Sequence, residues 1–224
     1  MQTDSQVLDD LIEKLELLYS GYSTTLRSAT DQYRLEQVIK LIPNYQYNPS
    51  DYLIRENLVE HVGSLPMAAT TFYPYINDSQ VDLGRALIML AIHDIGELTI
   101  GDTNTFVKND SDKEKEVERS AAYMYLDPSY HELYLEIEEQ STATGKFAKS
   151  IDKITPDILD YMVPVEITVE RFKHFVHIEP EEMVDLIIKH KRPYMLWNPF
   201  LTDFHVMLVD KFKEKLDAYI KNTK

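Results

Sequence analysis

A short stretch in the middle of the chain places ionisable side chains directly after an apolar segment. Residues 83–92 are apolar on nearly every side, as expected of a helix inside a larger protein. The next ten residues contain His93, Asp94, Glu97, Thr99 and Asp102. Burying such groups without partners costs free energy. A bound metal ion would supply a partner, so the stretch predicts metal chemistry.

The spacing within this stretch agrees with that interpretation. His93 and Glu97 are four residues apart, so one continuous helix would place them on the same face. Gly96 and Gly101 flank the predicted helix end, where a tight turn or a close backbone approach favours glycine. A His-Asp pair such as His93-Asp94 also arises by chance, so the interpretation depends on the rest of the chain.

The composition limits which atoms can hold a metal. The 224 residues include no cysteine, which excludes disulfides, thiolate zinc sites and cysteine nucleophiles and leaves histidines and carboxylates as ligands. The formal net charge of −15 argues against binding to nucleic acid duplexes. The first residues are polar and no apolar run is long enough to span a bilayer, so we expect a cytoplasmic protein without a membrane partner.

Nearly the whole chain has helical patterning, and no segment alternates cleanly enough to predict a strand. One predicted helix carries His61, another ends at His93, and two more end near residues 126 and 140. The other predicted helices span residues 7–19, 33–42, 146–162, 164–177, 180–191 and 199–221.

Polar residues and prolines predict where these helices begin and break. Asp51 is the expected N-cap of the helix with His61, and Pro66 is expected to kink or divide that helix. The remaining expectations are a cap at Asp78 or Ser79 for the helix that ends at His93, a capping box of Ser111 and Glu114, a cap at Asp127, and an interruption near Pro156.

Three blocks of the chain together resemble a known family. They are Glu56-Asn-Leu-Val-Glu-His61, His93-Asp-Ile-Gly-Glu97 with Gly101-Asp102, and Ala148-Lys-Ser-Ile-Asp-Lys153. The ordered set resembles the HD-domain phosphohydrolases, specifically their 5'-deoxynucleotidase branch, over roughly residues 50 to 160. The resemblance implies an all-α fold, an HD-domain helical bundle with extra C-terminal helices. Residues 1–224 would form a single HD domain, with a motif core at about 50–160 and a C-terminal helical extension at about 164–224.

The resemblance implies that His61, His93, Asp94 and Asp152 hold one divalent metal ion. Two imidazoles and two carboxylates suit Mn, Co, Ni, Fe or Zn, and the sequence does not choose among them. Superfamily members with two metal ions are expected to carry two more histidines between the His-Asp pair and the last Asp. Only His131 lies there, at a position expected to face solvent. We therefore predict a single metal and hydrolysis in preference to oxygen chemistry.

The resemblance also implies roles for other residues. Glu97 would act as a general acid or base, and Asp102 would position the sugar or the attacking water. Arg55 and Lys153 are candidate phosphate ligands. The family's Arg-Trp pair before the first histidine is missing, since Asn44-Tyr-Gln46 stands in its place. Tyr45 could replace the aromatic residue, but no arginine aligns.

The function implied is a metal-dependent phosphohydrolase, namely a nucleotidase that releases phosphate from (deoxy)nucleoside 5'-monophosphates. The alternatives are a nucleoside triphosphate triphosphohydrolase of the same superfamily and a non-catalytic nucleotide-binding or regulatory protein. The expected partners are a small phosphorylated substrate and a second copy of the chain, to which residues 200–220 could contribute. His174 and His177 lie three residues apart, but no third ligand accompanies them, so we interpret them as surface or interface residues.

Overall fold

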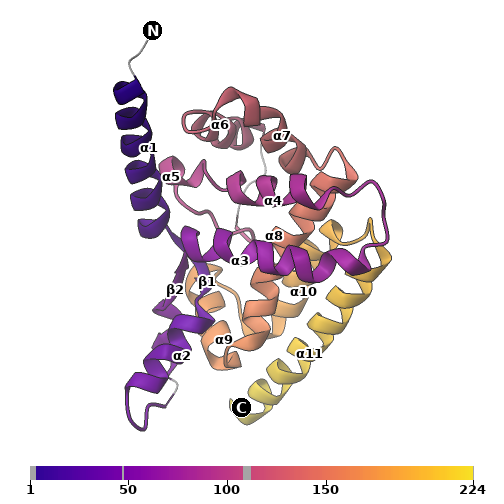
Figure 1. The fold of residues 1–224 in the computed structure, drawn as a ribbon. Helices are drawn as coiled ribbons and strands as arrows, with labels where there is room; N and C mark the ends of the chain where they lie inside the picture. The colour runs from indigo at the N-terminus through magenta and orange to yellow at the C-terminus, as the bar shows by residue number, and fades with distance from the viewer. Residues whose placement is uncertain (1–3, 47, 108–111, 224) are drawn as a thin grey trace.

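The computed structural model describes residues 4–46, 48–107 and 112–223, which form a helical bundle with one small sheet (Figure 1). The predicted all-α class is confirmed. The α-helices are α1 (Asp4–Thr24), α2 (Gln32–Leu41), α3 (Leu58–Phe72), α4 (Leu83–Ile92), α5 (Glu97–Ile100), α6 (Asp112–Tyr123), α7 (His131–Glu139), α8 (Ala143–Met162), α9 (Val165–Phe175), α10 (Pro180–Lys191) and α11 (Pro199–Thr223). Short 3₁₀ helices cover Pro49–Leu53, Tyr73–Tyr75, Pro128–Tyr130 and Arg192–Tyr194.

Helix α8 lies at the centre of the bundle and contacts α3, α4, α7 and α11, while α1 and α11 lie at opposite sides (Figure 1). The core between α3, α4 and α8 is apolar and fully buried, and it includes Leu65, Met89, Leu90, Phe147 and Ile151. Removing these side chains from water is the main force that holds the three helices together. Because the three sequence blocks lie on these helices or directly at their ends, this packing brings the blocks to one place.

The sheet was not predicted. Strand β1 (Leu26–Thr30) pairs antiparallel with β2 (Arg55–Asn57), and the register shifts between the two ends of the pair. Such short strands are stabilised by pairing between distant segments, which local alternation does not report. Strand β2 leads directly into α3, so β1 lies beside the start of the helix that carries His61.

The helix that carries His61 begins later than predicted. Its N-cap is Asn57, whose side chain accepts from the Glu60 amide at 3.0 Å, while the Asn57 amide donates to Glu60 Oε2 at 2.8 Å. This reciprocal capping box satisfies two helix-terminal donors. Asp51 lies instead inside the 3₁₀ helix capped by Asn48, so the cap predicted at Asp51 is wrong.

Helix α4 is also capped at a different residue than predicted. Asp82 accepts from the Arg85 amide at 2.9 Å, so neither Asp78 nor Ser79 is the N-cap. Asp127 does cap its 3₁₀ turn, as predicted, by accepting from the Ser129 amide at 2.9 Å. The predicted capping box of Ser111 and Glu114 lies outside the described residues, because Ser111 is not among them.

Neither internal proline interrupts its helix. Helix α3 continues through Pro66, and α8 continues through Pro156, so the predicted division and interruption are wrong. Each proline removes one backbone hydrogen bond. The turns around them remain helical because neighbours such as Leu65 and Ile154 are fully buried in the core.

The C-terminal helices lie close to their predicted positions. Helix α10 has the predicted bounds, and α9 and α11 differ from prediction by one or two residues at their ends. Such differences are normal at helix termini. None of the described helices is both long enough and apolar enough to span a membrane.

Candidate metal centre

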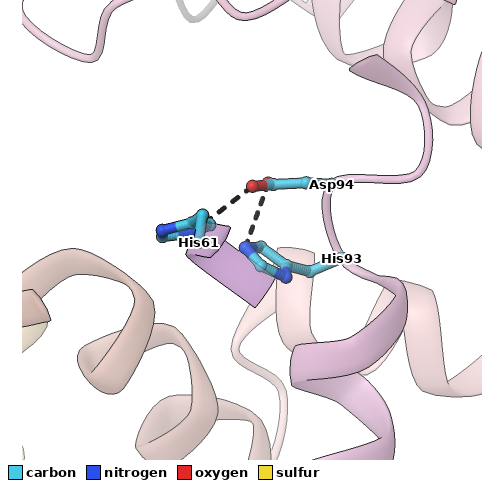
Figure 2. A group of neighbouring side chains, drawn as sticks. All are labelled: His61, His93 and Asp94. Atoms are coloured by element: carbon cyan, nitrogen blue, oxygen red, sulfur yellow. Dashed lines mark ion pairs between the residues drawn. The ribbon is translucent and has the colours of Figure 1, made fainter. Parts of the chain in front are cut away.

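Four side chains from three helical segments meet at one buried point. His61 lies on α3, His93 is the C-cap of α4, Asp94 follows it, and Asp152 lies on α8. All four side chains are buried. Figure 2 shows the rings of His61 and His93 near the Asp94 carboxylate, which forms an ion pair with each of them. The structure therefore brings together all the residues predicted as metal ligands.

The distances are those of a cluster of potential ligand atoms. His93 Nε2 lies 3.0 Å from Asp94 Oδ1, and His61 Nε2 lies 3.5 Å from Asp94 Oδ2. Both Nε2 atoms lie 3.4 Å from Asp152 Oδ1. The ligand atoms of His61, His93 and Asp94 all fall within 4.8 Å of one another. One ion at this point would meet the expected mixture of nitrogen and oxygen ligands.

Each imidazole is oriented by a partner on its other nitrogen. His93 Nδ1 lies 2.9 Å from the Leu90 carbonyl, so Nδ1 carries the hydrogen of that bond. His61 Nδ1 lies 3.4 Å from Glu56 Oε2, too poorly aligned for a hydrogen bond but close enough for charge attraction. Backbone carbonyls and carboxylates orient metal-binding histidines in the same way.

The cluster leaves buried polar atoms without hydrogen bonds. They are Nε2 of His61, Nε2 of His93 and Oδ2 of Asp152, judged against all partners in the described structure. Buried polar groups almost always find a partner, because an unpaired one costs free energy. A cation between the two imidazoles and the carboxylates would satisfy the nitrogens, so the residues present fit a metal ion.

In the metal-free protein the charged groups of the cluster shift one another's pKa values. Burial alone would lower the pKa of His93, but the carboxylates of Asp94 and Asp152 outweigh it and raise the pKa to about 10. Burial would raise the pKa of Asp94, but His93 and Arg27 outweigh it and hold the pKa well below its ordinary value. Asp152 has a lowered pKa because Lys153 and His93 outweigh its burial. Without a metal, a protonated His93 therefore neutralises part of the carboxylate charge.

Glu97 reaches the cluster by a different route than predicted. Helix α4 ends at Ile92 and α5 begins at Glu97, so His93 and Glu97 do not share the face of one continuous helix. The Glu97 amide donates to the Asp94 carbonyl at 3.0 Å, and this turn returns the carboxyl to the site. Burial, and then repulsion from Asp94, raise the pKa of Glu97 well above its ordinary value.

Arg27 is the site residue that sequence reasoning missed. Its guanidinium pairs with Asp94 and lies 3.5 Å from Glu97 Oε2 and 3.7 Å from Glu56 Oε2. No arginine stands near Tyr45, where the family resemblance predicts one, but Arg27 reaches the site from strand β1. The local sequence carries no signal for this, since the placement depends on pairing between β1 and β2.

Asp102 and Arg55 hold the strand that carries Arg27. Asp102 Oδ2 accepts from the Ser28 amide at 2.8 Å. Arg55 donates to the Leu26 carbonyl at 3.0 Å and also to the Arg27 carbonyl. Neither side chain contacts the four-residue cluster through any interaction of the described residues. Their observed contacts position β1, while the predicted contacts with substrate remain predictions.

The two other candidate substrate ligands lie in different surroundings. Lys153 Nζ is 3.1 Å from Asp152 Oδ2, at the edge of the cluster. Tyr45 donates to the Asp51 carboxylate, and no contact within the described part of the chain joins it to the cluster. Lys153 is therefore placed for a role beside a metal, whereas the structure does not bring Tyr45 there.

The remaining histidines lie outside this centre. His131 is half-buried and stacks on Tyr123 at 3.7 Å between ring centroids, so the prediction that it faces solvent is wrong. His174 and His177 are exposed. Among the described residues, the one group of three or more potential metal ligands is that of His61, His93 and Asp94.

Comparison with known proteins places this geometry in context. A family model described as an HD domain matches residues 50–166, just over half of the chain. A solved structure of a predicted metal-dependent phosphohydrolase from Magnetospirillum magnetotacticum MS-1 is 23% identical, covers 95% of this chain and 97% of its own, and gives a TM-score of 0.62. A conserved hypothetical protein from Pyrococcus furiosus is 20% identical, with 91% and 99% covered and a TM-score of 0.53. At such identities these two likenesses concern the fold alone. No curated protein matches the chain.

Proposed function

The chain belongs to the HD-domain family, and from this membership we propose that it is a metal-dependent phosphohydrolase. The observation that carries the proposal is the convergence of His61 and His93 on Asp94 and Asp152, with both Nε2 atoms buried and unsatisfied. Within the family we propose the 5'-deoxynucleotidase-like branch, with nucleoside 5'-monophosphates as substrates. A divalent ion bound there would supply positive charge to the phosphoryl oxygens and a water of lowered pKa.

Glu97 is the proton carrier in this proposal. Its pKa is raised because the carboxyl is buried and repelled by Asp94, and its Oε2 has no hydrogen bond in the described structure. A carboxyl with a pKa moved toward neutrality can exchange a proton with the attacking water or with the leaving oxygen. Arg27 lies 3.5 Å away and holds the side chain beside the cluster.

Arg27 also provides the positive charge that an anionic substrate requires. The net charge of −15 repels anions at long range, so local cations must overcome that field. Arg27 is 12% exposed and directed at the carboxylates of the centre. We propose that it takes the place of the arginine that is missing near Tyr45, because a guanidinium binds phosphate oxygens in a planar, two-pronged geometry.

A cavity beside Glu97 offers room for the leaving group. Its volume is about 320 Å³, and its lining includes Glu97, Gly101, Lys113 and Val117. Cavities that bind small molecules begin at about 300 Å³. The size supports a leaving group as large as a nucleoside but does not distinguish one base from another.

The test is a phosphate-release assay on protein loaded separately with Mn, Co, Ni and Zn, over a panel of ribo- and deoxyribonucleotides. We expect orthophosphate from monophosphates. Glu97→Gln should reduce kcat by about 10²- to 10⁴-fold with metal still bound, while Glu214→Gln on an exposed position of α11 should not. Release of triphosphate would move the assignment to a triphosphohydrolase. No turnover on any nucleotide, with metal bound, would indicate another phosphate ester or a binding role.

A further inference from the structure

A small cavity beside Asp152 is lined by several cations. Its volume is about 30 Å³. The charged residues around it are four cations and four carboxylates, namely Arg27, Lys153, Arg171, Lys191, Asp102, Asp152, Asp157 and Asp160. A space of this size admits one or two water-sized atoms, such as the oxygens at one edge of an oxyanion. Arg171 and Lys191 belong to α9 and α10, beyond the residues that the family model matches.

Most charged groups around this cavity already have partners. Arg171 pairs with Asp160 and donates to the Ser28 carbonyl at 3.0 Å. Lys153 lies 3.1 Å from Asp152 Oδ2. These contacts join α8, α9 and β1, and they compensate the charges of Arg171 and Lys153.

Lys191 differs from its neighbours. The residue is only 4% exposed, and it forms no ion pair or hydrogen bond with any residue that the structure describes. Its Nζ lies over the face of Phe106, 5.5 Å from the ring centroid. Burial lowers the pKa of Lys191, and Asp157 is the carboxylate that most opposes this effect. Asp157 Oδ2 lies 3.4 Å from His205 Nε2.

A buried ammonium without a partner costs free energy unless a ligand compensates it. We propose that Lys191, together with Lys153, forms an anion-binding subsite that receives oxygens of a tetrahedral oxyanion beside the metal centre. The subsite rests on the proposed function, in which that oxyanion is the phosphoryl group of the substrate. It gives the C-terminal helices a direct role in binding.

The charges of the metal centre make this subsite dependent on metal. In the metal-free protein Lys153 pairs with Asp152, and Arg27 pairs with Asp94. If both carboxylates ligate a cation, the two basic groups lose part of their attraction to them. With Asp152 bound to the cation, the four basic side chains of the cavity face only Asp102, Asp157 and Asp160, and this small surplus of positive charge favours an anion.

The test measures binding of orthophosphate to the metal-loaded full-length chain by calorimetry. We expect binding to the wild type and affinity that is weaker by about tenfold or more in Lys191→Met, because a charge-assisted hydrogen bond is lost. Lys191→Arg should retain binding, and Lys189→Met, an exposed position of the same helix, should match the wild type. All four proteins should still bind the metal. Unchanged orthophosphate affinity in Lys191→Met, or no binding to the wild type, would overturn the subsite.

A crystal structure of the wild type with metal and orthophosphate decides the matter if Lys191→Met does not fold. A phosphate oxygen at about 2.8 Å from Lys191 Nζ supports the subsite. Phosphate bound elsewhere, with only water near Nζ, overturns it.

The two proposals fail in different ways. If the protein binds orthophosphate through Lys191 but hydrolyses no phosphate ester, the proposed function is wrong and the subsite is supported. If the protein is an active hydrolase, and Lys191→Met changes neither its KM nor its inhibition by orthophosphate, only the subsite is wrong.

Discussion

The two imidazoles of the candidate metal centre are fixed by unlike partners. His93 donates a hydrogen bond to the Leu90 carbonyl, one helical turn earlier in the chain. This partner is an uncharged backbone group. His61 faces the Glu56 carboxylate, which also lies near Arg27. The orientation of His93 therefore depends on the geometry of α4, while that of His61 depends on a network of charges.

The raised pKa of His93 predicts that metal binding releases a proton. Burial lowers this pKa, but Asp94 and Asp152 outweigh it and raise it to about 10, so at pH 7 the metal-free imidazole is protonated. A metal must displace that proton, so its affinity should rise about tenfold per pH unit above pH 7 and level off near pH 10. Calorimetry in buffers of different ionisation enthalpy should detect about one proton released at pH 7. An affinity independent of pH would contradict the protonated state.

Arg27 and the metal should compete for Asp94. Arg27→Met leaves a buried carboxylate with less compensation, so the free energy of unfolding of the metal-free protein should fall by about 3 kcal/mol in urea titrations. A metal ion restores positive charge, so it should stabilise this variant more than the wild type. Arg119→Met, which removes a surface ion pair with Glu116, should change stability by less than about 1 kcal/mol. Equal stabilisation of Arg27→Met and wild type by metal would refute the competition.

At the scale of elements, the short turn between α4 and α5 decides where the acidic groups point. His93 to Gly96 leave the helix, and α5 restarts at Glu97. The turn packs closely against α6, because a Cβ on Gly96 would lie 2.8 Å from the Glu118 carbonyl oxygen. Gly101 ends α5 with φ of +76°, a conformation that suits glycine.

Two glycine substitutions separate close packing from helix propensity. Gly96→Ala should destabilise the protein by about 1–3 kcal/mol, because backbone atoms of α6 must move. Gly63→Ala on α3 should stabilise it by about 0.5–1 kcal/mol, because no atom lies within 4 Å of the added Cβ. Urea unfolding monitored by circular dichroism measures both. A Gly96→Ala variant as stable as the wild type would show that α5 and α6 are not held this closely.

At the scale of the whole molecule, the C-terminal helices are part of the packed body. Helix α11 buries an apolar stripe against the rest of the chain, with contacts to α8, α9 and α10. The stripe consists of Leu201, Leu208, Val209, Phe212 and Leu216. This face is already covered within one chain, so we do not propose it as the contact between subunits.

The homodimer remains a prediction. Light scattering on the purified protein at micromolar concentration should give twice the chain mass of 26.2 kDa. The same mass should be found for the metal-free and metal-loaded protein, since the proposed ligands all come from one chain. A monomeric mass under both conditions would refute the prediction.

The sequence alone determined the helical class, the residue types that could hold a metal and most helix positions. These follow from local patterns, since apolar periodicity marks helices and ionisable residues after an apolar helix mark a buried site. Even local signals failed where two residues competed, as when Asn57 rather than Asp51 capped α3. There the reciprocal bond to Glu60 decided the start.

Only the tertiary structure placed the charges around the candidate ligands. Arg27 meets Asp94 across 67 residues of chain, and Asp102 meets Ser28 across 74. Lys191 reaches the cavity beside Asp152 because α10 packs on the bundle. No local pattern encodes such contacts, because the energy of a charge depends on its burial and on which distant groups surround it.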